Sequence, residues 1–167
     1  MHSSDLVISD RSGVCTVKVR GRANFEYAVP LREIAKGSSV LKRLVIDLGE
    51  CTAMDSTFMG VLTMLALRSR RDHTEMSLCN ASAALQKLLR DLGVIKLFTF
   101  TEEAPVRTSG SAETAGPASP GLLDTAETVS EAHKTLIGAA PENLDKFRDV
   151  VAFADADVER LKKDDHK

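Results

Sequence analysis

An acid and two hydroxyls stand together near the middle of this chain, in Asp55-Ser56-Thr57. They follow an apolar run at residues 44–46 that predicts a strand covered on both faces. They also open a helical pattern that continues through Leu67. A helix N-terminus has free backbone N–H groups and partial positive charge, which together stabilise a phosphate. This junction could therefore hold a switchable serine without catalytic residues of its own.

The same three residues also fit a purely structural role. Asp, Ser and Thr are the usual N-cap residues, and many helices begin with them for stability alone. The tripeptide by itself therefore leaves both interpretations open, and the order of the surrounding elements has to decide between them.

Composition favours an ordinary soluble domain. The chain has 167 residues, of which 43% are hydrophobic, enough for one packed domain and an extension. The net charge of -2, the absence of Trp and an aromatic content of 4% argue against a nucleic-acid partner. No apolar run reaches the length of a membrane helix, so we expect no membrane partner.

The cysteines favour a cytoplasmic protein. Their number, 3, is odd, they have no paired spacing, and each lies in or beside an apolar strand pattern. The N-terminus has no basic segment leading into an apolar one, as a signal peptide would. We therefore expect reduced, buried thiols in the cytosol.

Strand and helix patterns alternate over roughly the first hundred residues. The expected strands lie at 6–9, 14–19, 43–48, 76–79 and 94–100, with a turn at 10–13 between the first two. The expected helices start at Asn24 or near Pro30, at Ser56 and at Ser82. This order predicts an α/β fold with a mixed, largely parallel sheet of about five strands and about three helices.

A helical extension is expected after this domain. Residues 105–121 have the composition of a flexible linker, which divides the chain into a domain at 1–104 and a helical tail at 122–167. Two apolar patterns mark the tail helices, the first at Leu122, Leu123, Ala126, Val129, His133, Leu136 and Ile137, the second at Leu144, Phe147, Val151, Ala154, Val158 and Leu161. These faces must dock, either on their own domain or on a second copy to form a homodimer.

Residues 5–103 resemble the STAS family, which includes bacterial anti-sigma-factor antagonists and the cytoplasmic domains of sulfate transporters. The resemblance rests on the element order and on residues 44–48 leading to Met54-Asp55-Ser56-Thr57 and then Gly60-Val61-Leu62. It implies that Ser56, rather than Thr57, is phosphorylated by a serine kinase that is also the anti-sigma factor. It further implies that the unphosphorylated protein binds this kinase and the phosphorylated protein releases it.

Two positions depart from the family pattern. Phe58 stands where glycine is common, and offers a large apolar surface either to the core or to a partner. Asn24 stands where an aspartate near the phosphosite is common, so the size is kept and the charge is lost. The expected partner-binding residues are Asn24, Asp55, Ser56, Thr57, Phe58 and Met59.

No pattern for catalysis or cofactor binding is present in the sequence. It has no Gly-rich phosphate loop, no metal-ligand spacing and no Ser-His-Asp grouping, and its four histidines are expected at the surface. We therefore expect a non-enzymatic signalling module without cofactor or metal. The alternatives are a scaffold or oligomerisation protein that is not phosphorylated, and a small-ligand sensor that binds near residues 55–60.

Overall fold

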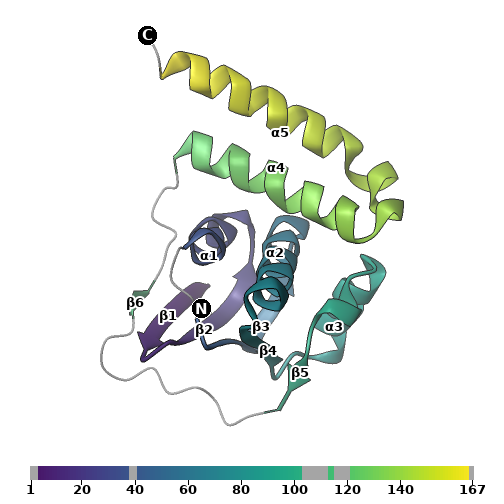
Figure 1. Cartoon of the computed structure of the whole chain (residues 1–167). Helices are drawn as coiled ribbons and strands as arrows, with labels where there is room; N and C mark the ends of the chain where they lie inside the picture. Colours follow the sequence, from purple (N-terminus) through teal and green to yellow (C-terminus); the bar gives the residue numbers. More distant parts are fainter. Residues whose placement is uncertain (1–3, 38–40, 103–112, 115–120, 166–167) are drawn as a thin grey trace.

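A mixed sheet forms the centre of the protein in the computed structural model, which describes residues 4–37, 41–102, 113–114 and 121–165 (Figure 1). The strand order is β5-β4-β3-β2-β1-β6. The strands are β1 (Asp5–Arg11), β2 (Val14–Ala23), β3 (Arg43–Met54), β4 (Glu75–Cys79), β5 (Phe100–Thr101) and β6 (Glu113–Thr114). β1 pairs antiparallel with β2 and β6, while β2 to β5 run parallel. The predicted mixed α/β sheet is confirmed.

The helices connect the parallel strands and then continue beyond the sheet. They are α1 (Phe25–Lys36), α2 (Ser56–Asp72), α3 (Ala83–Asp91), α4 (Leu122–Ala139) and α5 (Leu144–Asp164), with short 3-10 turns η1 (Ile95–Leu97) and η2 (Pro141–Asn143). The predicted helical C-terminal extension is thus present as α4 and α5.

Local sequence explains how the sheet begins. Ser12 and Gly13 both have positive φ, the backbone that a tight two-residue hairpin turn requires. The turn sets the register in which Arg11 pairs with Val14 and Asp5 with Arg20. For the first helix, the structure chooses Asn24 as its start, because the Asn24 side chain accepts a hydrogen bond from the Glu26 N–H, and Pro30 lies within the helix.

The last predicted strand, at 94–100, is wrong over most of its length. Gly93 adopts a left-handed backbone after α3, and the chain then forms η1 before the short β5 pairs with β4. Val94 is fully buried without belonging to a strand. A short apolar run signals burial but does not separate a strand from a packed turn, which explains the error.

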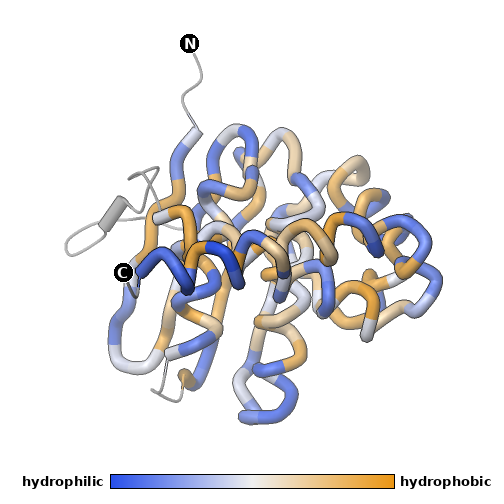
Figure 2. The backbone as a smooth tube through the Cα atoms, turned by 90° about the horizontal axis from the view of Figure 1, so that it is seen from above, coloured by the Kyte–Doolittle hydropathy of each residue, from blue (hydrophilic) through white to orange (hydrophobic). Residues whose placement is uncertain are grey.

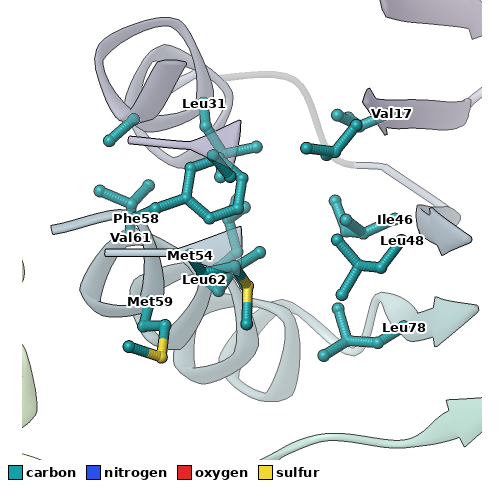
Figure 3. Close-up of a cluster of buried hydrophobic side chains, with 14 of the residues drawn as sticks. Val17, Leu31, Ile46, Leu48, Met54, Phe58, Met59, Val61, Leu62 and Leu78 are labelled. Carbon is teal, nitrogen blue, oxygen red and sulfur yellow. The ribbon is translucent and has the colours of Figure 1, made fainter. Parts of the chain in front are cut away.

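The core lies between the sheet and the helices α1 and α2. Figure 3 shows Val17, Ile46, Leu48 and Leu78 of the strands opposite Leu31 of α1 and Phe58, Val61 and Leu62 of α2, all of them buried. Burial of these side chains is the main stabilising contribution to the domain and fixes the position of the α2 N-terminus.

α4 and α5 form a second helical layer. In Figure 1, α4 crosses α1 and α2, and α5 lies on the far side of α4. Figure 2 looks down on this layer and shows hydrophilic and hydrophobic residues alternating along the segment that ends at the C-terminus. The tail thus docks on its own domain in this structure; a homodimer through the same helices stays a prediction.

Most of the predicted linker at 105–121 lies outside the described residues. Within it, β6 pairs with β1 through Val7 and Ile8, which extends the sheet at its antiparallel edge. Gly121 then precedes α4.

Candidate functional site

The predicted junction forms at the edge where β2 and β3 end together. Ala23 pairs with Met54, so the residues that follow them, Asn24 and Asp55, cap the adjacent helices α1 and α2. The Asp55 N–H donates to the carbonyl oxygen of Ala23 at 3.0 Å, which ties the two strand ends together. The strand register therefore brings the two polar positions named from the family pattern to one edge of the sheet.

Asp55 is the N-cap of α2. Its carboxylate accepts a hydrogen bond from the Phe58 N–H at 2.8 Å, which satisfies one of the free donors of the helix. Burial raises the pKa of the Asp55 carboxyl, while the backbone N–H groups of Phe58, Phe25 and Thr57 and the nearby His133 act to lower it. Asp55 is therefore a helix cap whose carboxyl group is partly buried.

Ser56 is the first residue of α2, and its hydroxyl contacts a histidine of the tail. Ser56 Oγ lies 2.9 Å from Nε2 of His133, and Nδ1 of His133 lies 2.7 Å from the carbonyl oxygen of Val129. Because a carbonyl only accepts, Nδ1 carries the hydrogen, and in the neutral ring Nε2 accepts the hydroxyl proton of Ser56. Burial lowers the pKa of His133, against the Val129 hydrogen bond and Asp55, and so favours this neutral form.

His133 corrects the prediction that the histidines lie at the surface. It is 2% exposed, and its ring meets the ring of Phe147 from α5 edge-on at 4.8 Å between centroids. The physical reason is that α4 docks with this side inward. The sequence contained a signal, since His133 occupies one position of an otherwise apolar helical pattern between Val129 and Leu136.

A close backbone approach holds α4 over the start of α2. A Cβ atom added at Gly60 would lie 2.5 Å from the carbonyl oxygen of Ala132 and 2.7 Å from its Cβ. No side chain fits there, so Gly60 and Ala132 are the small residues that allow the two helices to meet. This contact lies one turn along α2 from Ser56.

A buried ion pair joins α4 to α1. The guanidinium of Arg32 is 1% exposed, and it donates to the two carboxylate oxygens of Glu131, from Nε and Nη2, at 2.8 Å each. Nη2 also lies 3.3 Å from Glu127. The hydrogen bonds from Arg32 lower the pKa of Glu131. Sequence analysis did not identify Arg32, Glu127 or Glu131, because their proximity depends on how the tail docks.

The six predicted partner-binding residues differ in their exposure to solvent. Asn24, Asp55 and Ser56 are partly exposed, whereas Thr57, Phe58 and Met59 are buried. Of the two positions offered for Phe58, the structure selects the core, because its ring is 0% exposed between α1, α2 and the sheet (Figure 3). Phe58 thus anchors the first turn of α2 in the core and does not form part of the surface of the site.

The Ser56–His133 pair has limited chemistry of its own. In a hydrolase, a third group such as a carboxylate orients the histidine, whereas here Nδ1 of His133 binds a helix carbonyl. Within the described residues, no cluster of His, Cys, Asp and Glu could hold a metal ion. In the same part of the chain, no helix is long and apolar enough to span a bilayer.

Sequence comparisons relate the chain to STAS-domain proteins. Residues 7–99 match the family model described as "Mlab, STAS domain". A STAS-domain containing protein of Pseudomonas aeruginosa (strain UCBPP-PA14) is 27% identical over 87 residues, which is 52% of this chain and 86% of that protein. The family model ends before α4, which contacts Ser56 through His133.

Solved structures show the same fold. The anti-sigma factor antagonist SpoIIAA in its unphosphorylated form superposes with a TM-score of 0.50 at 12% identity, covering 61% of this chain and 89% of that one. The Bacillus cell fate determinant SpoIIAA in the phosphorylated form also gives a TM-score of 0.50, at 11% identity, covering 62% and 93%.

Proposed function

The chain belongs to the STAS domain family, and from that premise we propose that it is a non-enzymatic partner-switching module of the anti-sigma-factor-antagonist kind. In this proposal a serine kinase that is also an anti-sigma factor binds the unphosphorylated protein and phosphorylates Ser56. The phosphorylated protein then releases the kinase. Asn24, Asp55 and Ser56 contribute to the contact surface, and Thr57, Phe58 and Met59 position it from the buried side.

One observation carries this proposal: Ser56 is the first residue of α2 and directly follows the capping Asp55 at the joint end of β2 and β3. A phosphate there lies at the positive end of a helix of 17 residues, which stabilises its charge. The same phosphate lies beside the carboxylate of Asp55, so it concentrates negative charge at the place where a partner must bind. Both forms of SpoIIAA share the fold, which accords with a switch that acts at the surface.

Phosphate mapping tests this proposal. The full chain is purified from its native cell, and its intact mass and phosphopeptides are measured for the wild type, Ser56→Ala and Thr57→Ala. We expect one phosphate on Ser56 in the wild type and in Thr57→Ala, and none in Ser56→Ala. A phosphate on Thr57 alone, or no phosphate in any growth condition, would contradict the proposal.

A second candidate is supported by the bond between Ser56 and His133. A hydroxyl that donates to a buried histidine is already engaged, which suits a scaffold in which α4 covers the site permanently and no phosphate is added. The same mapping experiment separates the two candidates, since a scaffold stays unmodified when the partner is present.

A further inference from the structure

The surface that α4 covers is called here the α1–α2 face and is defined by Arg32, Ser56 and Gly60. Each of these residues contacts a different residue of the stretch 131–133 of α4, and Arg32 also pairs with Glu127 one turn earlier. Arg32 pairs with Glu131, Gly60 touches Ala132, and Ser56 bonds to His133. Three consecutive residues of α4 thus supply a carboxylate, a small side chain and a hydrogen-bond acceptor.

α4 matches this face incompletely. Nη1 of Arg32 is buried and has no hydrogen-bond partner among the residues that the structure describes. An unpaired N–H of a buried charged group is costly, so the contact is weaker than its geometry would allow. The side chain of Glu131 is 45% exposed, which further weakens the pair by solvent screening. A competing helix with a better-placed acceptor could displace α4.

α4 and a phosphate on Ser56 exclude each other. The distance of 2.9 Å between Ser56 Oγ and His133 Nε2 leaves no space for a phosphorus atom and its oxygens between them. His133 is also fixed from its other side by Val129 and Phe147. A kinase can therefore reach Ser56 only when α4 has moved.

We infer that the α4–α5 hairpin (residues 122–164) occupies the α1–α2 face in place of the partner, and that the partner binds this face by presenting a helix of the same chemistry. This rests on the proposed function, in which the partner must reach Ser56. The hairpin acts as an intramolecular competitor, and binding or phosphorylation requires its release.

The contacts specify what the partner helix presents. Carboxylates four residues apart, as in Glu127 and Glu131, face Arg32. A small residue follows the second carboxylate and lies against Gly60, because the two chains approach so closely that a Cβ on Gly60 would lie 2.7 Å from the Cβ of Ala132. A hydrogen-bond acceptor follows next and faces Ser56. Charge complementarity to Arg32 thus makes the partner an acidic helix with a small residue at its centre.

A labelled peptide of residues 121–165 serves as the probe of the open face. It is titrated by fluorescence anisotropy into the full chain as wild type, as Glu131→Lys and as Asp149→Lys. Glu131→Lys places a cation against Arg32 and opens the hairpin, while Asp149→Lys makes the same charge change on an exposed position of α5. We expect Glu131→Lys to bind the peptide at least about tenfold tighter than the other two, because a larger fraction of molecules is open.

The double variant Gly60→Ala, Glu131→Lys shows whether the peptide uses the same face. It should lose the peptide binding, because the new Cβ blocks Ala132 of the peptide. Equal peptide binding by all single variants, or binding that survives Gly60→Ala, would overturn the inference. So would light scattering that finds a wild-type dimer with exchanged hairpins, since a second copy would then be the occupant.

Hydrogen exchange on the wild-type chain provides a test without substitutions. The amides of α4 should exchange through a local opening, faster than those of β3 and the second half of α2. Exchange of α4 only together with β3 would overturn the inference. Neither experiment uses phosphate or a kinase, so each can fail while Ser56 is phosphorylated, and each can succeed when it is not.

Discussion

The two helical layers over the sheet are held by different forces. α2 buries most of its first half against the core, including the ring of Phe58. α5, described over its whole length, has Ala154 as its one buried residue and leaves the ring of Phe153 74% exposed. Between them, α4 buries Ala132 and Leu136 against the core and also contacts the domain through the Arg32–Glu131 and Ser56–His133 pairs. α2 is thus stabilised almost wholly by apolar burial, whereas α4 combines a smaller apolar contact with polar pairs, and α5 adds little burial of its own.

The largest expected difference between the layers concerns their two phenylalanines. Phe58→Ala removes a ring from the core and should lower the free energy of unfolding by about 3–5 kcal/mol. Phe153→Ala removes a ring that is mostly in water and should change it by less than about 0.5 kcal/mol. Urea unfolding of the two variants checks this, and equal losses would show that α5 is part of the core.

Two glycines allow the contact between α2 and α4 to be compared with the exposed side of α4. Gly60→Ala forces α4 away from α2, because the new Cβ would lie 2.5 Å from the Ala132 carbonyl oxygen, and overpacking of this kind costs roughly 1–3 kcal/mol. Gly138→Ala meets nothing within 4 Å on α4 and should stabilise the helix by up to about 1 kcal/mol. Opposite signs in urea unfolding are the expected result. A stabilising Gly60→Ala would contradict the close approach of the two helices.

Removal of the charge of Glu131 has a more moderate effect. Glu131→Gln leaves the buried guanidinium of Arg32 with only Glu127 as its ionic partner. A fully buried pair would lose more, but Glu131 is partly exposed, so we expect a loss of roughly 1–2 kcal/mol. The double variant with Arg32→Met should recover part of this loss in a double-mutant cycle. No coupling between the two positions would show that the pair contributes nothing to docking.

The smallest effect is a pH dependence from His133. Its pKa is lowered in the folded protein, so the unfolded state binds more protons below its ordinary value of 6.5, and the stability of the docked tail falls as the pH falls below that value. Asp55, with a raised pKa, acts in the opposite direction. Glu131 has a lowered pKa, so its contribution to stability is lost only when the pH falls below about 4.5.

The variant His133→Gln isolates this contribution. It keeps a polar side chain but does not titrate, so subtracting its pH profile from that of the wild type removes Asp55 and Glu131 from the comparison. Hydrogen exchange of α4 between pH 7 and pH 5 provides the measurement. An identical pH profile in the variant would show that His133 does not control the docking of the tail.

The sheet, α2 and the position of Ser56 could be predicted from the sequence. The contacts that α4 makes with Arg32 and Ser56 could not. The apolar run at 44–46, the capping Asp55 and the helix after it are local signals, and they gave the sheet, α2 and the position of Ser56. The contacts of Arg32 with Glu131 and of Ser56 with His133 join residues far apart in the chain. The apolar pattern through Ala126, His133 and Leu136 indicates which face of α4 docks, but no local pattern encodes where on the domain it docks.

Occupancy of Ser56 by phosphate in the native cell tests the central claim most directly. It is measured by quantitative phosphopeptide mapping of the full chain as wild type, Glu131→Lys and Asp149→Lys. The account predicts phosphate on Ser56, with higher occupancy in Glu131→Lys, where α4 is released, and unchanged occupancy in Asp149→Lys. An unphosphorylated Ser56 in all three proteins, the released variant included, would contradict it.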